Sequence, residues 1–172
     1  MEQNAQNSHA KGAQPYLHEV QYYETDGMRI VHHSNYIRWF EEARLAALKK
    51  DGMDYDRMEE EGIIIPVLSA SCTYKMAVHY GETVKIYSEI DSFNGLRFGV
   101  RYQIYDMEEK VLHATGTTTH CFLDRNMKPM NVKRHAPEVY QYFQAKADAY
   151  DNKFRFSGGA QYNAKSEIAM YS

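Results

Sequence analysis

Hydrophobic and polar positions follow two different periods along this chain, which separate a helical part from a strand-rich part. Between residues 35 and 50 the apolar side chains recur in steps of three and four, which places them on one face of a helix. They are Tyr36, Phe40, Ala43 and Ala47, with Ile37 and Leu48 widening the stripe. We therefore predict an amphipathic helix whose apolar face packs against another layer.

Both ends of this helix carry residues that favour a helix terminus. Ser34 or Asn35 can cap the N-terminus, because a short polar side chain there accepts a hydrogen bond from a free backbone N–H. Lys49 and Lys50 fall in the last turn and Gly52 lies just beyond it, as is typical of a helix C-terminus. These signals make it the best-defined element of the chain.

The period changes to two in the middle of the chain, which indicates strands. Residues 82–93 and 96–105 both read as strands, and the Asn94-Gly95 pair between them is a strong signal for a tight hairpin turn. A polar turn then leads to a Thr-rich strand at 111–123. We therefore predict three consecutive antiparallel strands.

Four further elements complete the pattern. We predict a first strand at 17–23, a short helix at 54–62, a strand at 63–78 and a surface helix at 136–150. Pro66 indicates that the strand at 63–78 has an irregular beginning or lies at a sheet edge. The chain has no internal repeat and no sign of a second domain.

The simplest fold for these elements is α+β. A helix with one apolar face needs a cover, and a meander of antiparallel strands with one apolar face supplies it. We therefore expect a curved antiparallel sheet around the long helix, formed by residues 16–150. Residues 1–15 are expected to be a disordered arm, and residues 151–172 a polar C-terminal extension.

Composition excludes several classes of function. Of 172 residues, 44% are hydrophobic and 25% are charged, so the chain can bury a core. The net charge is −3 without a basic cluster, which argues against nucleic acid as a partner. No apolar run approaches the roughly 20 residues that cross a bilayer. Because the N-terminus also lacks the apolar segment of a signal peptide, we expect a cytoplasmic protein in which Cys72 and Cys121 are reduced core thiols.

The stretch ETDGMRIVHHSNY, residues 24–36, is the best candidate for chemistry. Asp26 can be a turn-forming residue, which the following Gly27 favours. Alternatively, Asp26 lies beside the N-terminus of the long helix, where free N–H groups and the helix dipole stabilise an oxyanion. A carboxylate in that place is a nucleophile or a general base.

The adjacent histidines His32 and His33 suggest chemistry less strongly. In regular backbone neighbouring side chains diverge, so we expect them not to face one pocket, which argues against a two-histidine metal site. The chain also has no phosphate-binding glycine loop, no nucleophile elbow and no dinucleotide fingerprint. We therefore expect neither a metal nor a cofactor.

Several motifs in the chain together resemble one known family. They are YYETD, IVHHSNYIRWFEEAR, EEEGIIIPV, SCTYKMAVHYGETV and ATGTTTHCFLDRNMKP. They resemble the acyl-CoA thioesterases of the 4-hydroxybenzoyl-CoA thioesterase type, in particular the YbgC-like branch, over residues 16–140. The resemblance implies a hotdog fold, an acyl-CoA substrate, and a homodimer or homotetramer with active sites at the subunit interface.

The resemblance also implies roles for residues of the candidate turn. The family's catalytic aspartate falls on Asp26, and the residue whose backbone N–H polarises the thioester carbonyl falls on His33. Ser34, Asn35 and Tyr36 match the segment that opens the helix and shapes the substrate pocket.

One position departs from the family pattern. The family has glycine where this chain has Arg29, whose guanidinium is then available to a carboxylate or a CoA phosphate. The candidate turn of this chain therefore differs from the family pattern at position 29.

Two alternatives to a thioesterase remain open at this point. A non-catalytic module that binds acyl-CoA or acyl-carrier protein would share the fold, with Arg29 marking the loss of activity. A hydroxyacyl dehydratase would need a histidine–acid pair in a segment similar to HFPG, which is absent from the sequence. Whether Asp26 attacks directly or activates water is also open.

Overall fold

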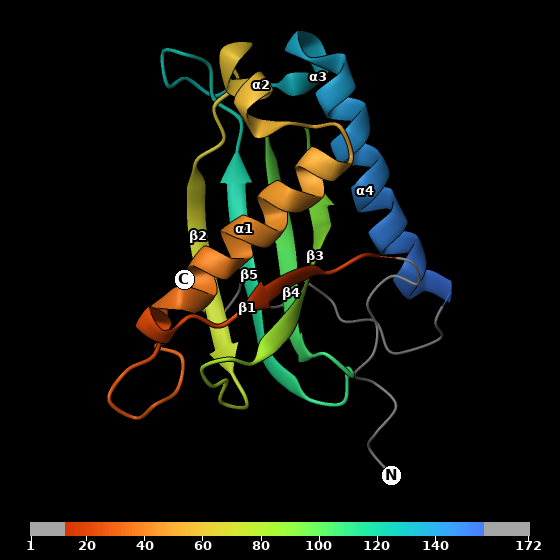
Figure 1. Cartoon of the computed structure of the whole chain (residues 1–172). Coiled ribbons are helices and arrows are strands. Elements are labelled where there is room, and N and C mark those ends of the chain that lie inside the picture. The colour runs from red at the N-terminus through yellow and green to blue at the C-terminus, as the bar shows by residue number, and fades with distance from the viewer. Residues whose placement is uncertain (1–12, 157–172) are drawn as a thin grey trace, which may run out of the picture.

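The computed structural model describes residues 13–156, which form one antiparallel sheet with helices packed on it (Figure 1). The elements in chain order are β1 (Tyr16–Glu19), the 3-10 helix η1 (Tyr22–Glu24), α1 (Ser34–Lys50), α2 (Tyr55–Glu60), β2 (Val67–Tyr74), β3 (Thr83–Phe93), β4 (Arg97–Asp106), β5 (Leu112–Cys121), α3 (Val132–His135) and α4 (Pro137–Phe156). The five strands are ordered β1-β3-β4-β5-β2. The predicted α+β architecture is confirmed.

The three consecutive strands β3, β4 and β5 form the centre of the sheet, as predicted. The Asn94-Gly95 turn joins the first two: Gly95 has a φ of 86°, and the Asn94 side chain accepts the N–H groups of Leu96 and Arg97. Strand β2 begins directly after Pro66 and lies at one edge of the sheet, where β5 is its one neighbour among the described strands. The tight turn and the edge position are therefore confirmed, whereas the strand predicted at 63–78 is too long, since β2 covers only Val67–Tyr74.

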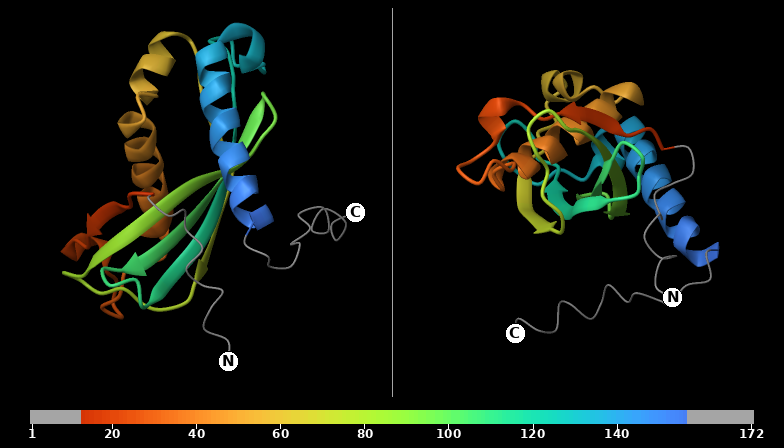
Figure 2. Two further views of the ribbon diagram at one scale, coloured as in Figure 1. Left: turned by 90° about the vertical axis from the view of Figure 1, so that its right-hand side faces the viewer. Right: turned by 60° about the horizontal axis from the view of Figure 1, so that its bottom comes forward.

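Helix α1 lies in the concave face of the curved sheet, as the two views of Figure 2 show. Its buried side includes Trp39 and Phe40, both without exposed surface. The predicted stripe is wrong at Ile37, which is 36% exposed, and it omitted Trp39. The stripe shifts toward Trp39 because the concave sheet and the segment before the helix both contact that side.

The first strand is shorter than predicted. Strand β1 ends at Glu19, and the chain then turns through η1 instead of continuing to residue 23. The cause is local: the Gln21 N–H donates to the side chain of Glu24 at 2.8 Å, which closes a helical turn.

The predicted C-terminal helix is longer than its 136–150 range, because α4 continues unbroken to Phe156. The expected boundary between the domain and the C-terminal extension, at residue 150, therefore falls inside this helix. The expected arm before residue 13 and the extension after residue 156 lie outside the described residues.

Two expectations from composition concern the thiols and the membrane. Cys72 and Cys121 are both free, and Cys121 is buried. Burial raises the pKa of the Cys72 thiol, which disfavours its reactive thiolate form. Within residues 13–156, none of the helices combines the length and the apolar character that a bilayer span requires.

The tightest contact between α1 and the sheet occurs at Gly116 of β5. A Cβ atom at this position would lie 2.2 Å from a ring carbon of Phe40 and 2.7 Å from the backbone oxygen of Ser71. The Phe40 ring also stacks on Tyr102 of β4 with 4.3 Å between ring centroids. The absence of a side chain at Gly116 therefore sets how deeply the helix lies in the sheet.

We expect Gly116→Ala to lower the free energy of unfolding by about 1–3 kcal/mol, the usual cost of overpacking a core. Chemical denaturation would measure it. Gly27→Ala is the matched control, since a Cβ atom there meets nothing within 4 Å. Equal stability of the two variants would contradict the conclusion that Gly116 sets how deeply α1 lies in the sheet.

Candidate functional site

The loop between Thr25 and Val31 presents the side chain of Asp26. Thr25 and Val31 form an isolated β-bridge, and the Arg29 N–H donates to the Asp26 carbonyl at 2.9 Å. One carboxylate oxygen of Asp26 accepts the Met28 N–H at 2.8 Å. Asp26 therefore does form the turn, and its other carboxylate oxygen has no hydrogen bond within the described part of the chain.

Arg29 has the backbone conformation that glycine adopts most easily. Its φ is 63°, in the left-handed region, which costs a residue with a side chain about 1 kcal/mol or more. The turn closes nonetheless, so arginine in place of the family glycine adds strain without opening the loop. The guanidinium is exposed and makes no hydrogen bond or ion pair within residues 13–156.

Helix α1 begins directly after His33, whose backbone N–H makes no hydrogen bond among the described residues. The Nδ1 atom of His32 accepts the Ser34 N–H at 3.3 Å, and the His32 carbonyl accepts the Asn35 N–H at 3.0 Å. The predicted capping by Ser34 or Asn35 is therefore wrong. Both residues lie inside the first turn, and His32 supplies the acceptors instead.

The two histidine rings lie side by side, with 4.0 Å between their centroids and 36° between their planes. The expectation that they diverge is wrong, because it assumed regular backbone and these residues are in the turn that enters the helix. His33 is exposed, and its carbonyl accepts the Tyr74 hydroxyl at 3.1 Å. The histidines thus form one aromatic surface next to the helix N-terminus.

Asn35 and Tyr36 point into the molecule. The Asn35 amide donates to the carbonyl of Glu24 at 2.8 Å, which ties the helix to the segment before the Asp26 turn. Tyr36 is buried and packs edge-on against Tyr74 with 5.0 Å between centroids. Burial raises the pKa of Tyr36 to about 12, so its phenol stays neutral. Both side chains support the site from beneath.

A buried carboxylate that the sequence did not reveal anchors this arrangement. Glu24 is only 4% exposed, and its oxygens accept the Trp39 indole N–H at 2.8 Å and the Gln21 backbone N–H at 2.8 Å. The Nε2 atom of His18 lies 2.9 Å from the same carboxylate. One side chain therefore joins β1, η1 and α1 two residues before Asp26.

Hydrogen bonding determines the charge state of Glu24. Burial alone would favour the neutral acid, but the hydrogen bonds from His18, Trp39 and the Gln21 N–H outweigh it and hold the pKa of this carboxyl below its usual value. Glu24 is therefore ionised at neutral pH, and its negative charge is satisfied by three donors.

One signal in the sequence pointed to such a group. Trp39 is the only tryptophan, and it lies near the apolar face of the predicted helix. A buried indole N–H normally finds an acceptor, so a polar partner was to be expected close to it. The pattern does not say which acid supplies that partner, because Glu24 reads as one more polar residue of a turn.

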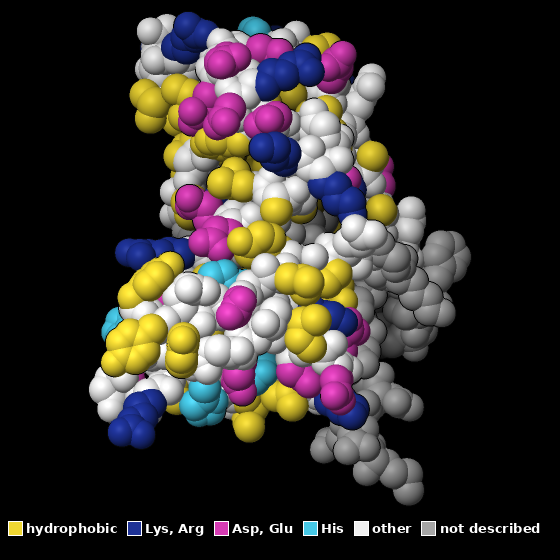
Figure 3. Space-filling view, viewed as in Figure 1, with side chains coloured by type: hydrophobic (Ala, Val, Ile, Leu, Met, Phe, Trp, Pro, Cys, Tyr) yellow, Lys and Arg dark blue, Asp and Glu magenta, His cyan; other side chains and the backbone are white. Residues whose placement is uncertain are grey.

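Apolar side chains surround the Asp26 turn on the surface. Figure 3 shows hydrophobic and histidine side chains at the lower part of the molecule, where the turn and the start of α1 lie. The large exposed ones near this end are Tyr22, Tyr23, Met28, Tyr74, Met76 and Tyr80. Such a surface is suited to contact with a ligand or with a second chain.

The arrangement is chemically suited to addition at a carbonyl group. A half-buried carboxylate lies on a short turn before a helix whose positive dipole end and preceding, unbonded His33 N–H can stabilise negative charge. Among residues 13–156, no three or more His, Cys, Asp or Glu side chains are grouped to hold a metal ion.

Comparison with known proteins shows which family this chain matches and which proteins it is similar to. Residues 20–147 match the family described as the thioesterase-like superfamily. A Bacillus subtilis protein named "Putative acyl-CoA thioesterase YneP" is 35% identical over 127 residues, covering 73% of this chain and 91% of its own. An Escherichia coli protein named acyl-CoA thioester hydrolase YbgC is 24% identical, covering 64% of this chain and 82% of its own.

Solved structures share the fold. The crystal structure of a DHNA-CoA thioesterase from Staphylococcus aureus superposes with a TM-score of 0.74 at 33% identity, covering 81% of this chain and 93% of that one. The curved sheet around a central helix is therefore the hotdog fold that the motifs implied.

Glu24→Gln should lower the free energy of unfolding at pH 7 by about 1–3 kcal/mol, because it removes the charge that three donors satisfy. The pKa of Glu24 is lower in the folded state than its unfolded value of 4.5. Its contribution is thus complete above pH 4.5 and is lost as the pH falls below it. Thermal unfolding from pH 7 to pH 3 should show the two proteins converging, while Glu19→Gln, at an exposed site on β1, follows the parent chain. A difference independent of pH would contradict this role.

Proposed function

The chain belongs to the thioesterase-like superfamily, and from this membership we propose that it hydrolyses acyl-CoA thioesters to a free acid and CoA. The observation that carries the proposal is the position of Asp26 on a tight turn a few residues before α1, which begins after His33 with its unbonded backbone N–H. In the proposed site Asp26 is the base or nucleophile, and the N-terminus of α1 stabilises the carbonyl oxygen.

In the proposed reaction the thioester carbonyl oxygen lies against the N-terminus of α1. The His33 N–H donates to this oxygen, and the helix dipole stabilises the charge that develops on it. On one route Asp26 adds to the carbonyl carbon, the thiolate of CoA leaves, and water then cleaves the mixed anhydride. On the other route Asp26 takes a proton from water, whose hydroxide adds to the carbon before the thiolate leaves.

The remaining predicted site residues fall into two groups. Arg29 and Ser34 are exposed beside the turn and are proposed to contact the substrate, with the Arg29 guanidinium on a CoA phosphate. Asn35 and Tyr36 are buried, so we propose that they act by holding the turn and the helix in register. The exposed ring of His33 is proposed to orient the thioester.

We propose that the active unit is a homodimer. Within residues 13–156 no strand pairs with β2 on the side away from β5, and seven of its eight residues are exposed, with Val67 and Leu68 each about half exposed. An open, apolar strand edge favours pairing with another strand. A second β2 would extend the sheet and bring a neighbouring chain beside the Tyr74–His33 contact.

We expect Asp26→Asn to lower kcat for acyl-CoA hydrolysis by about 100-fold or more, because amide nitrogen and oxygen neither attack the carbon nor take a proton from water. Release of CoA thiol from a panel of aliphatic and aromatic acyl-CoAs would measure it. Asp56→Asn, at an exposed position on α2, should retain full activity.

Two outcomes would count against the proposed function. Full activity of Asp26→Asn would remove this residue from the mechanism. Saturable binding of an uncleavable acyl-CoA analogue without turnover of any thioester would favour the non-catalytic binding module. Light scattering on the same preparation should give the mass of a dimer, and an active monomer would contradict the shared interface.

Replacing Arg29 by glycine should have opposite effects on stability and on substrate binding. Arg29→Gly should raise the free energy of unfolding by about 1 kcal/mol, since glycine adopts the left-handed conformation without strain. The same change should raise KM several-fold with kcat unchanged if the guanidinium binds a CoA phosphate. Arg29→Lys, which keeps the charge, should retain a KM near that of the parent. A KM unaffected by Arg29→Gly would refute the phosphate contact.

A further inference from the structure

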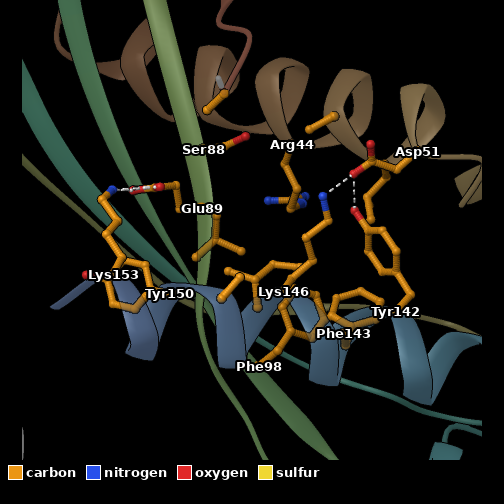
Figure 4. Close-up of a pocket in the computed structure, with 16 residues that line it drawn as sticks. Arg44, Asp51, Ser88, Glu89, Phe98, Tyr142, Phe143, Lys146, Tyr150 and Lys153 are labelled. Atoms are coloured by element: carbon orange, nitrogen blue, oxygen red, sulfur yellow. Dashed lines mark hydrogen bonds and ion pairs between the residues drawn. The ribbon is translucent and has the colours of Figure 1, made fainter. Parts of the chain in front are cut away.

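A cavity lies far along α1 from the Asp26 turn. It has a volume of about 470 Å³, is open to solvent on one side, and is lined by the C-terminal half of α1, by β3 and β4, and by α4 (Figure 4). Arg44, which lines it, follows Ser34 by ten residues, so it lies about 15 Å along the helix axis from the first turn. The cavity is therefore separate from the proposed thioester site.

Apolar side chains form the body of this cavity. They come from three sides of the space and are Leu48, Ile90, Phe98, Val100 and Phe143. The volume is within the range of cavities that bind small organic molecules. An occupant with a hydrocarbon or aromatic body would thus replace water in contact with these residues.

Helix α4 is tied over the cavity at two places. Lys146 lies 2.7 Å from a carboxylate oxygen of Asp51, which also accepts the Tyr142 hydroxyl at 2.8 Å. Farther along α4, Lys153 pairs with Glu89 of β3 at 2.9 Å. Figure 4 shows these contacts on opposite sides of the space. Both carboxylates of the cavity are therefore already paired with lysines.

Arg44 is the one cation of the cavity lining without a carboxylate partner among the described residues. Its Nη1 atom donates to the Tyr102 hydroxyl at 3.3 Å and lies 3.4 Å from Nε2 of His120. His120 has no exposed surface, and burial together with the neighbouring Arg44 charge lowers its pKa to about 3, so it stays neutral. Both contacts of the guanidinium are thus uncharged.

The charges of the lining consequently do not balance. Three cationic side chains (Arg44, Lys146 and Lys153) line the space against two carboxylates (Asp51 and Glu89), which leaves one positive charge. In Figure 4 the Arg44 side chain extends from α1 into the space between the two helices. A half-buried guanidinium in an apolar cavity is stabilised by an anion that can accept two of its N–H groups.

We propose that this cavity binds a small amphipathic carboxylic acid as its anion, with the carboxylate on Arg44 and the apolar body against Phe98, Val100 and Phe143. A single unbalanced positive charge matches a monoanion, and the planar carboxylate matches the guanidinium fork. This choice of ligand rests on the proposed function, because thioester hydrolysis releases an acid of this class. The cavity would bind that acid at a distance from Asp26.

Isothermal titration calorimetry with decanoate and with 2-naphthoate tests this site without using activity. The parent chain should bind one equivalent, and Arg44→Gln should weaken binding by about tenfold or more, as expected for loss of a charged hydrogen-bond pair. Arg38→Gln, at an exposed position on the same helix, is the matched control and should bind as the parent does. Inorganic phosphate, which lacks an apolar body, should not compete.

Two further measurements separate this site from the thioester site. Asp26→Asn should bind the acid unchanged, and free CoA should not displace it, whatever the outcome for hydrolysis. Should Arg44→Gln fail to fold, Ala149→Phe, which places a ring in the cavity from α4, should abolish binding instead. Binding unaffected by the cavity variants, displacement by CoA, or no saturable binding by the parent would each overturn the proposal.

Discussion

The depth at which α1 lies in the sheet is the constraint on which the other features depend. The Phe40 ring occupies the space where residue 116 would carry a Cβ atom, and it stacks on Tyr102 of the adjacent strand. With the helix held at this depth, Trp39 is fully enclosed, and its indole N–H needs an acceptor that water cannot supply. Packing at the centre of the sheet thereby buries an indole N–H, and Glu24 accepts its hydrogen bond.

The buried Glu24 carboxylate transmits that packing to the surface. Its three donors come from β1, from Gln21 directly before η1, and from α1, so the segment before Asp26 is fixed relative to the start of the helix. The backbone reinforces this contact, because the Glu24 carbonyl accepts both the Asn35 amide and the His32 N–H. Contacts of this kind fix the short turn that carries Asp26 relative to the first residues of α1.

Features that follow from local periodicity could be predicted from the sequence. The central helix, the three consecutive strands, the Asn94-Gly95 turn and the edge position after Pro66 all agree with the structure. These elements have strong apolar patterns or turn residues with one preferred conformation. The position of Asp26 before the helix followed from the order of the same elements.

What the sequence did not reveal depends on contacts between segments. Trp39 rather than Ile37 faces the core because two other elements converge on that side of α1. The chain leaves β1 early because a glutamate side chain closes η1, and His32 replaces the expected helix cap because the turn brings its ring to Ser34. Each outcome reflects side chains meeting across a turn, which a periodic pattern does not encode.

The two ends of α1 perform different electrostatic tasks. At its N-terminus the helix has a partial positive charge, with the unbonded N–H of His33 directly before it, and this end therefore favours negative charge nearby. Toward its C-terminus, Lys49 and Lys50 complement the opposite end of the dipole, and Asp51 is occupied by Lys146 and Tyr142 of α4. Hydrogen bonds from those two groups outweigh burial and lower the pKa of Asp51, so the tie to α4 holds a full charge. The ion pairs that hold α4 in place use both carboxylates of the cavity, and this is why the Arg44 charge is left for an anion from outside the protein.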